Sequence, residues 1–371
     1  MPAKETGFEF ADDLGPKTIQ YIHEPTIGLK AILVVDNVAA GPSIGGVRMA
    51  SDVTTAECFR LARAMTFKNA AAGLSHGGGK SAILADPKMP VADKERLVRA
   101  FACAIGPIAD YIPGPDMGTN ETAMAWIQDE IGRSVGLPRA LGGIPLDEIG
   151  ATGFGLAACA EVAKDYANLN LMGARIAVQG FGSVGKHAAR FLAEKGAVLV
   201  AVADSHGTVH DPNGLDVDGL IAVKQQRGDV TDYEGGRKLD REAIIGVECD
   251  IWIPAARPDV IRLENVGEVK ARLILQGANI GVTEEAETIL HERGVVCVPD
   301  FISNAGGVIC AAVEYHQGTQ TQAFQTIDEK IRANTAEVLG RAAKDGVRPR
   351  EAAVAMATER VRAANKLRRW G

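Results

Sequence analysis

Two kinds of apolar pattern alternate along the chain, and together they predict a mixture of strands and helices. Residues 31–35, 175–179 and 198–203 are short apolar runs of the kind that forms buried strands. Residues 55–69 instead carry apolar side chains at helical spacing, and Thr54 with Glu57 forms a capping box at their start.

From about Gly150 the alternation becomes regular. After the strand at 175–179 come a predicted helix at 184–195, the strand at 198–203 and further apolar runs at 251–253, 273–275 and 295–298. Such alternation favours a mostly parallel sheet with helices on both faces. A glycine and proline cluster at 141–145 is the candidate linker before this region, and the residues from about 327 to 361 are helical. We therefore expect an α/β fold with two domains.

Composition narrows the classes of function. The chain has 371 residues, which also favours two domains, and its 40 basic and 47 acidic residues form no basic cluster, so nucleic acid is excluded as a main partner. No apolar window approaches the ~18 residues that a membrane span needs, and the N-terminus lacks the apolar core of a secretory signal. We expect a cytoplasmic protein with no membrane partner. Six scattered cysteines without CxxC spacing predict buried free thiols and no metal site: Cys58, Cys103, Cys159, Cys249, Cys297 and Cys310.

A glycine-rich turn joins the strand at 175–179 to the following helix, and it matches the dinucleotide fingerprint GxGxxG: Gly180, Phe181, Gly182, Ser183, Val184 and Gly185. Gly180 allows the tight turn, Gly182 lets the backbone approach a pyrophosphate, and Gly185 allows close packing of helix on strand. The helix N-terminus offers unpaired N–H groups to the phosphates. The alternative is a glycine turn that binds nothing.

Asp204 ends the next strand and is the expected acceptor for the hydroxyls of the adenosine ribose. Its charge would repel a 2′-phosphate, which favours NAD as the cofactor. Ser205 and His206 follow directly and offer donors to such a phosphate, so NADP stays open.

Two lysines and an aspartate carry the candidate chemistry. Lys68 falls on the predicted apolar face of residues 55–69 with Cys58 and Met65, and Lys80 follows a glycine triplet that we expect to form a turn. Two lysines beside a backbone that only glycine allows suggest an anion pocket, in which one holds a carboxylate and the other acts as acid or base. Asp116, in a Pro-Gly-Pro-Asp turn, is the candidate partner that moves protons. The alternative is that both lysines are ordinary surface residues.

Eight segments, in this order, resemble the glutamate/leucine/phenylalanine/valine dehydrogenase family: 41–48, 65–70, 77–80, 151–155, 180–185, 253–256, 277–279 and 303–308. The resemblance implies a reversible, nicotinamide-linked oxidative deamination of an L-amino acid to a 2-oxo acid and ammonia. It also implies an N-terminal α/β substrate domain of residues 1–147 plus 332–371, with the C-terminal helices returning to it. A Rossmann-like dinucleotide-binding domain of residues 148–331 would lie between, and the family likeness implies a homo-oligomer, hexameric or octameric.

The same resemblance implies roles for individual residues. Lys68 would bind the substrate α-carboxylate, Lys80 would activate water, and Asp116 would carry a proton to and from the amino nitrogen. Gly45 and Gly46 would let the backbone approach the substrate. On the cofactor side, the fingerprint residues would be joined by members of the other matching segments: Thr152 at the nicotinamide carboxamide, Asn279 at the nicotinamide ribose, and Ala255 and Asn304.

Two departures from the glutamate-specific pattern bear on the substrate. Ile44 stands where those members have a lysine that grips the side-chain carboxylate, and Ala311 stands where they have a serine. A glutamate carboxylate would then be buried unpaired, at a cost of at least several kcal/mol, whereas an apolar side chain gains ~25 cal/mol per Å² buried. We therefore expect an apolar substrate of the leucine, valine or phenylalanine type. The alternatives are a glutamate dehydrogenase, in which Arg48 or His76 rescues the polar side chain, and a silent nucleotide-binding relative.

Overall fold

A computed structural model describes residues 8–368 and divides the chain into two compact units. The first unit runs to Pro145 and takes in Val308–Ala323 and the residues from Met356 onward; the second comprises Leu146–Gly307 and Phe324–Ala355. The first boundary lies two residues from the expected one at 147. The C-terminal division differs more, because the chain leaves the second unit at 308, rejoins it at 324 and leaves it again at 356, where we expected a single return at 332.

The reason for this difference lies in packing. Ala311 of α10 (Gly306–Tyr315) is buried in an apolar cluster of the first unit, whereas Thr335 of α11 (Gln320–Asp345) donates to the Cys159 sulfur in the second unit. Helical periodicity tells which face of a helix is buried but not which core receives it.

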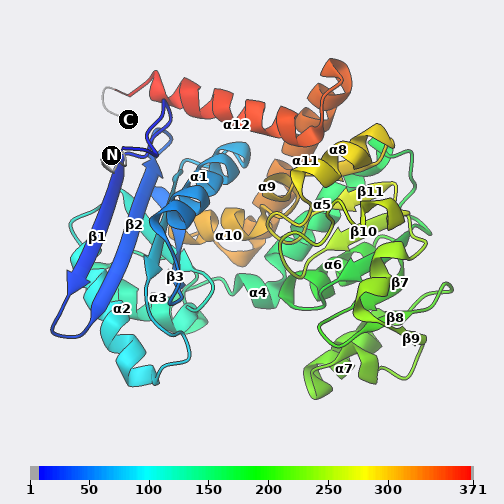
Figure 1. Ribbon diagram of the computed structural model, residues 1–371, viewed down its shortest axis with the longest axis horizontal. Coiled ribbons are helices and arrows are strands. Elements are labelled where there is room, and N and C mark those ends of the chain that lie inside the picture. Colours follow the sequence, from blue (N-terminus) through cyan, green and yellow to red (C-terminus); the bar gives the residue numbers. More distant parts are fainter. Residues whose placement is uncertain (1–7, 369–371) are drawn as a thin grey trace, which may run out of the picture. The chain divides into compact units, whose positions relative to one another are not determined.

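A five-stranded sheet forms the centre of the first unit, in the order β1-β2-β4-β3-β5. Figure 1 labels three of its strands, β1, β2 and β3, and the helices α1, α2 and α3 of the same unit. β1 and β2 pair antiparallel, as do β2 and β4, whereas β3 pairs parallel with both β4 and β5. The strands are β1 Thr18–Glu24, β2 Leu29–Asn37, β3 Ser43–Met49, β4 Gly77–Ile83 and β5 Tyr111–Pro115. The expected strand at 31–35 is thus β2.

Helices cover both faces of this sheet. Ile32 and Val34 of β2 pack with Cys58 and Ala62 of α1, while the alternate residues of β2 pack with α2 and α3. The helices are α1 Thr55–Ala71, α2 Val91–Ile105 and α3 Glu121–Ile131, followed near the C-terminus by α12 Pro349–Asn365, whose last ten residues belong to this unit. One half of the predicted capping box is present: the Thr54 side chain accepts from the backbone N–H of Glu57, whereas the Glu57 carboxylate accepts from Arg48.

The glycine triplet lies inside β4 and does not form the turn that we expected. A Cβ at Gly77 would meet the Asn37 carbonyl oxygen at 1.7 Å, and one at Gly78 would meet the Thr66 backbone nitrogen at 2.0 Å. These glycines therefore allow β4 to lie close to β2 and to α1. The lack of a side chain at these positions is therefore explained by packing within the protein.

The second unit is built on a seven-stranded sheet, ordered β12-β11-β10-β6-β7-β8-β9. The five strands from β12 to β7 are parallel and β8 and β9 add antiparallel pairs, so the predicted mostly parallel sheet is confirmed. The strands are β6 Arg175–Gln179, β7 Val198–Ala203, β8 Thr208–His210, β9 Arg237–Leu239, β10 Ile251–Pro254, β11 Leu273–Leu275 and β12 Val296–Val298. The helices are α4 Leu146–Ile149, α5 Ala151–Tyr166, α6 Ser183–Ala193, α7 Val217–Arg227, α8 Glu284–Glu292 and α9 Asp300–Ser303, with most of α11.

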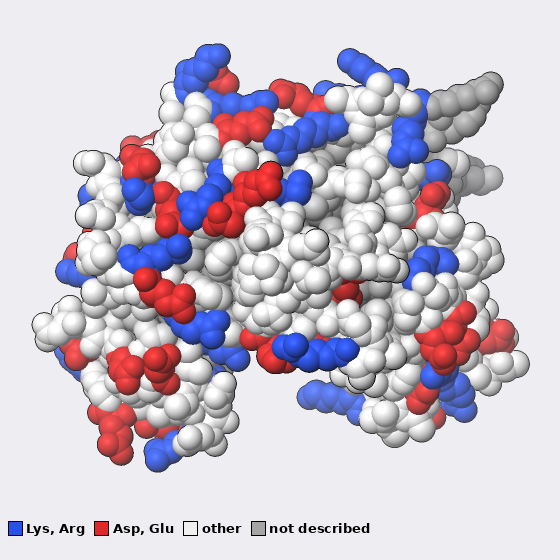
Figure 2. Space-filling model, turned by 180° about the vertical axis from the view of Figure 1, so that it is seen from behind, with Lys and Arg blue, Asp and Glu red and all other residues white. Residues whose placement is uncertain are grey.

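The charge distribution on the surface and the state of the cysteines can be compared with what the composition predicted. Acidic and basic side chains are interspersed on the face drawn in Figure 2, with no broad basic patch there. No helix among residues 8–368 is long and apolar enough to cross a membrane.

All six cysteines are free, but Cys103 is exposed, which corrects the expectation that every thiol is buried.

Candidate active site

The predicted acid and base form a buried ion pair in the first unit. Lys80 Nζ lies 2.8 Å from Asp116 Oδ1, and the lysine side chain is only 6% exposed. Lys80 extends from β4, and Asp116 follows the last residue of β5, so the two meet across the strand β3 that separates β4 from β5. The segment before Asp116 is an edge strand and not the turn that we expected, which an edge position permits despite Pro113 and Pro115.

A short hydrogen-bonded turn sets the direction of Asp116. The Thr119 hydroxyl donates to the Val47 carbonyl oxygen at 2.8 Å, and the Asp116 backbone nitrogen lies 3.0 Å from the same hydroxyl oxygen, to which it donates. Gly118 has a φ of +84° in this turn, and a Cβ there would meet the Met49 carbonyl oxygen at 2.1 Å. The turn thus ties Asp116 to β3.

Arg48 completes the constellation, and it is a residue whose part in it we did not expect. Its Nε donates to Asp116 Oδ2 at 2.9 Å, and its Nη1 donates to Glu57 Oε1 at 2.6 Å. Ile44, Gly46 and Arg48 alternate along β3, so the period of a strand places them on one face. That period is the signal by which sequence reasoning might have found Arg48. Its guanidinium is thus engaged by two carboxylates, through Nε and Nη1.

The electrostatics favour an ionised Asp116. Burial alone would raise the pKa of this carboxyl, but Lys80 and Arg48 outweigh burial and hold the pKa below its ordinary value. A carboxylate paired on both oxygens with cations is a stable anion and accepts a proton only when one of its cations moves away.

The two glycines expected at the substrate have different surroundings. A Cβ at Gly46 would lie 2.7 Å from the Asp116 Cβ and 3.1 Å from Lys80 Nζ, so this glycine leaves the space in which the ion pair forms. A Cβ at Gly45 would lie 1.7 Å from the Gly79 carbonyl oxygen. Gly45 is therefore required by the packing of β3 on β4.

Lys68 lies in the last turn of α1 and is half-buried. The buried face of α1 is formed by Cys58, Ala62, Thr66 and Asn69. Of residues 58, 65 and 68, which we expected on this face, only Cys58 belongs to it. Lys68 therefore lies at the border of the buried face. From there its long side chain can hold the ammonium group at a polar group while its aliphatic part stays partly exposed.

The two positions that depart from the glutamate pattern lie in one apolar cluster. Ile44 and Ala311 are 3% and 7% exposed, and they pack with Ile112, Val135 and Ala312, with Leu74 and Tyr315 at the edge. The tertiary structure thus brings together two residues that are 267 positions apart in the chain, as the family pattern implied.

A histidine pair borders this cluster. His76 Nδ1 lies 3.0 Å from the Pro42 carbonyl oxygen, so it carries the proton and donates, and Nε2 lies 3.1 Å from Nε2 of His316. His76 also meets the Tyr315 ring edge-on, 5.6 Å between centroids. Burial, reinforced by His316, lowers the pKa of His76 although the Pro42 contact opposes this. His316 had no sequence signal, because only the fold places it beside His76.

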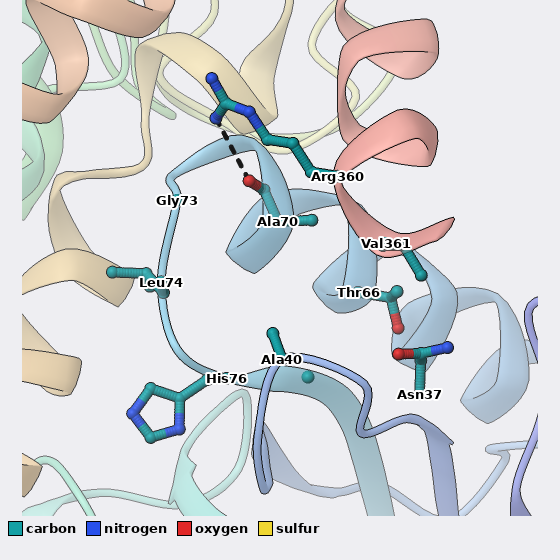
Figure 3. A pocket seen from close by; sticks show the side chains of 10 residues that line it. Asn37, Ala40, Thr66, Ala70, Gly73, Leu74, His76, Arg360 and Val361 are labelled. Carbon is teal, nitrogen blue, oxygen red and sulfur yellow. Dashed lines mark hydrogen bonds between the residues drawn. The ribbon is translucent and has the colours of Figure 1, made fainter. Parts of the chain in front are cut away.

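A separate cavity of about 260 Å³ lies at the C-terminal end of α1 (Figure 3). Arg360 of α12 donates to the Ala71 carbonyl oxygen at 2.7 Å there and so caps the helix. None of the predicted site residues lines this cavity: the lining comprises Asn37, Ala40, Thr66, Ala70, Gly73, Leu74, His76, Gly77, Arg360 and Val361.

In the second unit the fingerprint has the geometry of a phosphate loop. Gly180 has a φ of +91°, and a Cβ there would lie 2.6 Å from the Ala256 nitrogen; a Cβ at Gly185 would lie 1.8 Å from the Gly180 carbonyl oxygen. At Gly182 a Cβ would meet no atom within 4 Å, and its φ of −85° suits any residue. The fold itself therefore needs Gly180 and Gly185, whereas the space over Gly182 suits a bound group. α6 starts at Ser183 without a side-chain cap, which suits an anion at its N-terminus.

Other predicted cofactor residues lie around this loop. Val184, the second residue of α6, lies beside Gly277, and Ser183 donates to the Asp147 carbonyl oxygen at 2.9 Å, so its hydroxyl is engaged within the protein. Thr152 lies in the first turn of α5, where its hydroxyl faces Gly307.

Two asparagines and an alanine lie at the carboxyl edge of the sheet. Asn304 donates to Asn279 Oδ1 at 3.1 Å and to the Gly277 carbonyl oxygen at 3.2 Å. Ala255 follows β10 and packs against Gly277 and Gly180. The carboxyl edge of parallel strands is where nucleotides bind in such sheets.

Asp204 differs from its expected role. Its Oδ2 accepts from Lys224 Nζ at 2.6 Å and from the Val230 nitrogen at 3.0 Å, and Oδ1 accepts from the His206 nitrogen at 2.9 Å. The side chain is 6% exposed. The carboxylate that we expected to face a ribose thus makes its hydrogen bonds within the protein.

Comparison with known proteins decides the family. The profile described as Glutamate/Leucine/Phenylalanine/Valine dehydrogenase matches residues 142–369, and that of the Glu/Leu/Phe/Val dehydrogenase dimerisation domain matches residues 20–133. The chain belongs to this family. The resemblance drawn from the eight segments is thereby confirmed, and the two family profiles together span both units.

Among the relatives of this Glu/Leu/Phe/Val dehydrogenase, some are named as specific for NADP and others as specific for NAD. An NADP-specific glutamate dehydrogenase of Saccharolobus shibatae is 40% identical over 75% of this chain and 69% of that protein. An NAD-specific glutamate dehydrogenase of Staphylococcus aureus is 37% identical over 80% of this chain and 75% of that protein. Among solved structures, the hetero-hexameric glutamate dehydrogenase of Thermus thermophilus in a leucine-bound form has a TM-score of 0.85, with 31% identity over 95% of this chain and 90% of that one. The two-domain dehydrogenase fold is therefore confirmed.

Proposed function

We propose that this protein catalyses the reversible oxidative deamination of an L-amino acid to a 2-oxo acid and ammonia, with NAD or NADP as oxidant. The observation that carries the proposal is the buried Lys80–Asp116 pair, which forms where Gly46 leaves space for it. Burial of a lysine costs free energy of desolvation, which the ion pair with Asp116 offsets, and a paired lysine and carboxylate are the groups that acid–base catalysis in this family uses. We propose a cytoplasmic homo-oligomer, as the family likeness implied.

We assign substrate binding and the proton transfers to different residues of the first unit. Lys68 holds the substrate α-carboxylate. Asp116 takes a proton from the substrate ammonium group, and a nicotinamide held by the second unit would supply the redox chemistry when bound, as acceptor of the hydride from the α-carbon. Lys80, after its ammonium group has lost a proton to solvent, takes a proton from the water that adds to the resulting imino acid, and the carbinolamine so formed releases ammonia. One amino acid, one water and one oxidised cofactor thus give a 2-oxo acid, ammonium, a reduced cofactor and one proton.

The residues of the second unit fit such a cofactor. Gly182 leaves open space at the uncapped N-terminus of α6, where a pyrophosphate gains backbone N–H donors and the helix dipole. Thr152, Asn279 and Asn304 are proposed to orient the nicotinamide end.

Two side-chain classes are proposed for the substrate, each on its own observation. The comparisons favour glutamate over the apolar substrate that we expected, because both relatives named above and the Thermus structure are glutamate dehydrogenases. The buried cluster of Ile44, Ala311 and Ile112 favours an apolar side chain, because it offers no group to pair with a carboxylate.

A panel of the twenty L-amino acids with each oxidised cofactor tests this proposal, followed by nicotinamide absorbance. Turnover on at least one amino acid is expected, and Lys80→Met should lower kcat by at least about a hundredfold while the reduced cofactor still binds. A higher kcat/KM on glutamate than on leucine supports the first substrate, and the reverse supports the second. Unchanged kcat in Lys80→Met would contradict the role of this lysine, and silence on all twenty would contradict the activity.

A further inference from the structure

Asp204 occupies the position at which dinucleotide-binding sheets choose between a ribose hydroxyl and a 2′-phosphate. It follows β7, directly beside the strand β6 that leads into the fingerprint loop. An exposed acid at such a position accepts from the ribose hydroxyls and repels the phosphate of NADP. The contacts of Asp204 in this protein are of another kind.

Both oxygens of Asp204 are held by donors of the same unit. Lys224 Nζ, at 2.6 Å, also donates to the Gly228 carbonyl oxygen at 2.7 Å, which fixes the ammonium at the C-terminal end of α7. The backbone nitrogens of Val230 and His206 supply the other two hydrogen bonds. A carboxylate has about four lone-pair sites, so three are occupied before any ligand arrives.

The charge of Asp204 is also balanced. Lys224 contributes one positive charge at hydrogen-bond distance, so the pair has no net charge toward a ligand a few ångströms away. A bare carboxylate at that separation repels a 2′-phosphate by Coulomb interaction, whereas a neutral pair offers only a weak dipole.

The groups that face outward here are donors together with one further acid. Ser205 and His206 are exposed, and the His206 ring is 60% exposed. Asp229 pairs with His206 Nδ1 at 3.2 Å, while its other oxygen accepts from the nitrogen and hydroxyl of Thr231 at 2.8 Å each. Thus Asp204 is paired with the ammonium group of Lys224, whereas Asp229 contacts the His206 ring, which balances its charge only when that ring is protonated.

We propose that Lys224 holds Asp204 as a structural anion and is thereby the residue that lets this dehydrogenase accept NADP as well as NAD. The inference rests on the proposed function, in which a nicotinamide dinucleotide binds this unit. It reverses the expectation that Asp204 selects NAD. It also assigns cofactor choice to a lysine of α7, 39 positions beyond the end of the fingerprint at Gly185.

Cofactor titration of the full-length protein tests the proposal without turnover. The Kd values of NADH and NADPH are measured by fluorescence, and their ratio in the wild type should lie within about tenfold of unity. Lys224→Met leaves Asp204 unbalanced, so NADPH binding should weaken by at least about tenfold relative to NADH. Lys270→Met, which removes an exposed lysine of the same unit, is the matched control and should leave the ratio unchanged.

Two further variants keep the test decisive if Lys224→Met folds poorly. Asp204→Asn alone leaves the charge of Lys224 unbalanced and should favour NADPH in either case, so the charge-neutral double variant decides: there, the loss of a free, discriminating acid would still favour NADPH by at least about tenfold. The double variant with Lys224→Met and Asp204→Asn should return the ratio to the wild-type value. A wild type that prefers NADH by more than about a hundredfold, with no change in Lys224→Met, would overturn this inference alone. Absence of binding by either cofactor would overturn the proposed function instead.

Discussion

At the scale of single residues, the candidate active site is a chain of alternating charges. Lys80, Asp116, Arg48 and Glu57 follow one another at hydrogen-bond distance, from a buried ammonium to a half-exposed carboxylate. Each carboxylate oxygen of Asp116 has its own cation, so the orientation of the group is determined before substrate binds. We infer that Arg48 acts as a positioning residue.

The acidity of Asp116 tests this inference. Arg48→Gln removes one of the two cations that lower the Asp116 pKa, so that pKa should rise by about one unit. Because the ionised carboxylate is the proposed proton acceptor, the acid limb of kcat/KM for deamination should move to higher pH by the same amount. Measurement of kcat/KM from about pH 3 to about pH 7, which covers the ordinary pKa of an aspartate and the region below it, checks this.

The control is Glu57→Gln, which leaves the Arg48–Asp116 bond in place and should move the limb by no more than a few tenths of a unit. The sign for stability follows from the same shift. Since the folded-state pKa of Asp116 lies below the unfolded value, its contribution is complete above the ordinary pKa of an aspartate and is lost as the pH falls through the folded-state pKa. In Arg48→Gln this loss should come at higher pH. An unmoved limb would assign Arg48 a packing role only.

At the scale of elements, glycines have two distinct purposes that look alike in the sequence. Gly77 and Gly78 of β4 are required because neighbouring backbone atoms occupy the space of a Cβ, whereas Gly182 at the start of α6 has open space around it. The first kind stabilises the sheet of the first unit, and the second is explained by a ligand.

A pair of alanine substitutions separates the two kinds. Gly78→Ala should lower the free energy of unfolding by at least about 3 kcal/mol, because the Thr66 backbone has to move. Gly182→Ala should leave the melting temperature unchanged and raise the Kd of NADH by at least about tenfold, because the added methyl enters the phosphate space. Thermal unfolding and NADH titration measure both. Equal NADH affinity in Gly182→Ala would argue against the phosphate loop.

At the scale of the whole molecule, side chains distant in sequence complete each unit. In the second unit Arg350 donates twice to Glu287, at 2.7 Å each, and pairs with Asp300 at 3.0 Å. Glu287 is 3% exposed and also accepts from Gln276, close to the Asn279 segment. Through these ion pairs, the start of α12 stabilises the segments at the carboxyl edge of the parallel sheet.

Removal of this arginine leaves two buried carboxylates without their cation. Arg350→Met should destabilise the protein by about 3–5 kcal/mol in chemical denaturation, whereas Arg262→Met, which breaks an exposed pair with Glu264, should cost less than about 1 kcal/mol. A loss in Arg350→Met no larger than in the control would mean that water compensates the buried acids.

Much of the secondary structure followed from local patterns. The strands at 175–179 and 198–203 agree with β6 and β7 residue for residue, and Thr54 caps the start of α1 as expected. These features depend on periodicity, capping and turn chemistry, which operate over a few residues. Proline misled us at β5, because an edge strand tolerates residues that usually signal a turn.

The sequence by itself determined which residues are the candidates for chemistry: the fingerprint, the two lysines, Asp116, and the apolar pair of Ile44 and Ala311. Residue type and spacing suffice for that, because they limit the chemistry that a segment offers. Only the tertiary structure decided how these groups are used. It paired Lys80 with Asp116, placed Arg48 between two acids, and turned Asp204 toward Lys224. The physical reason is that charge pairing and burial depend on distances between segments, and those distances exist only once the sheets have formed.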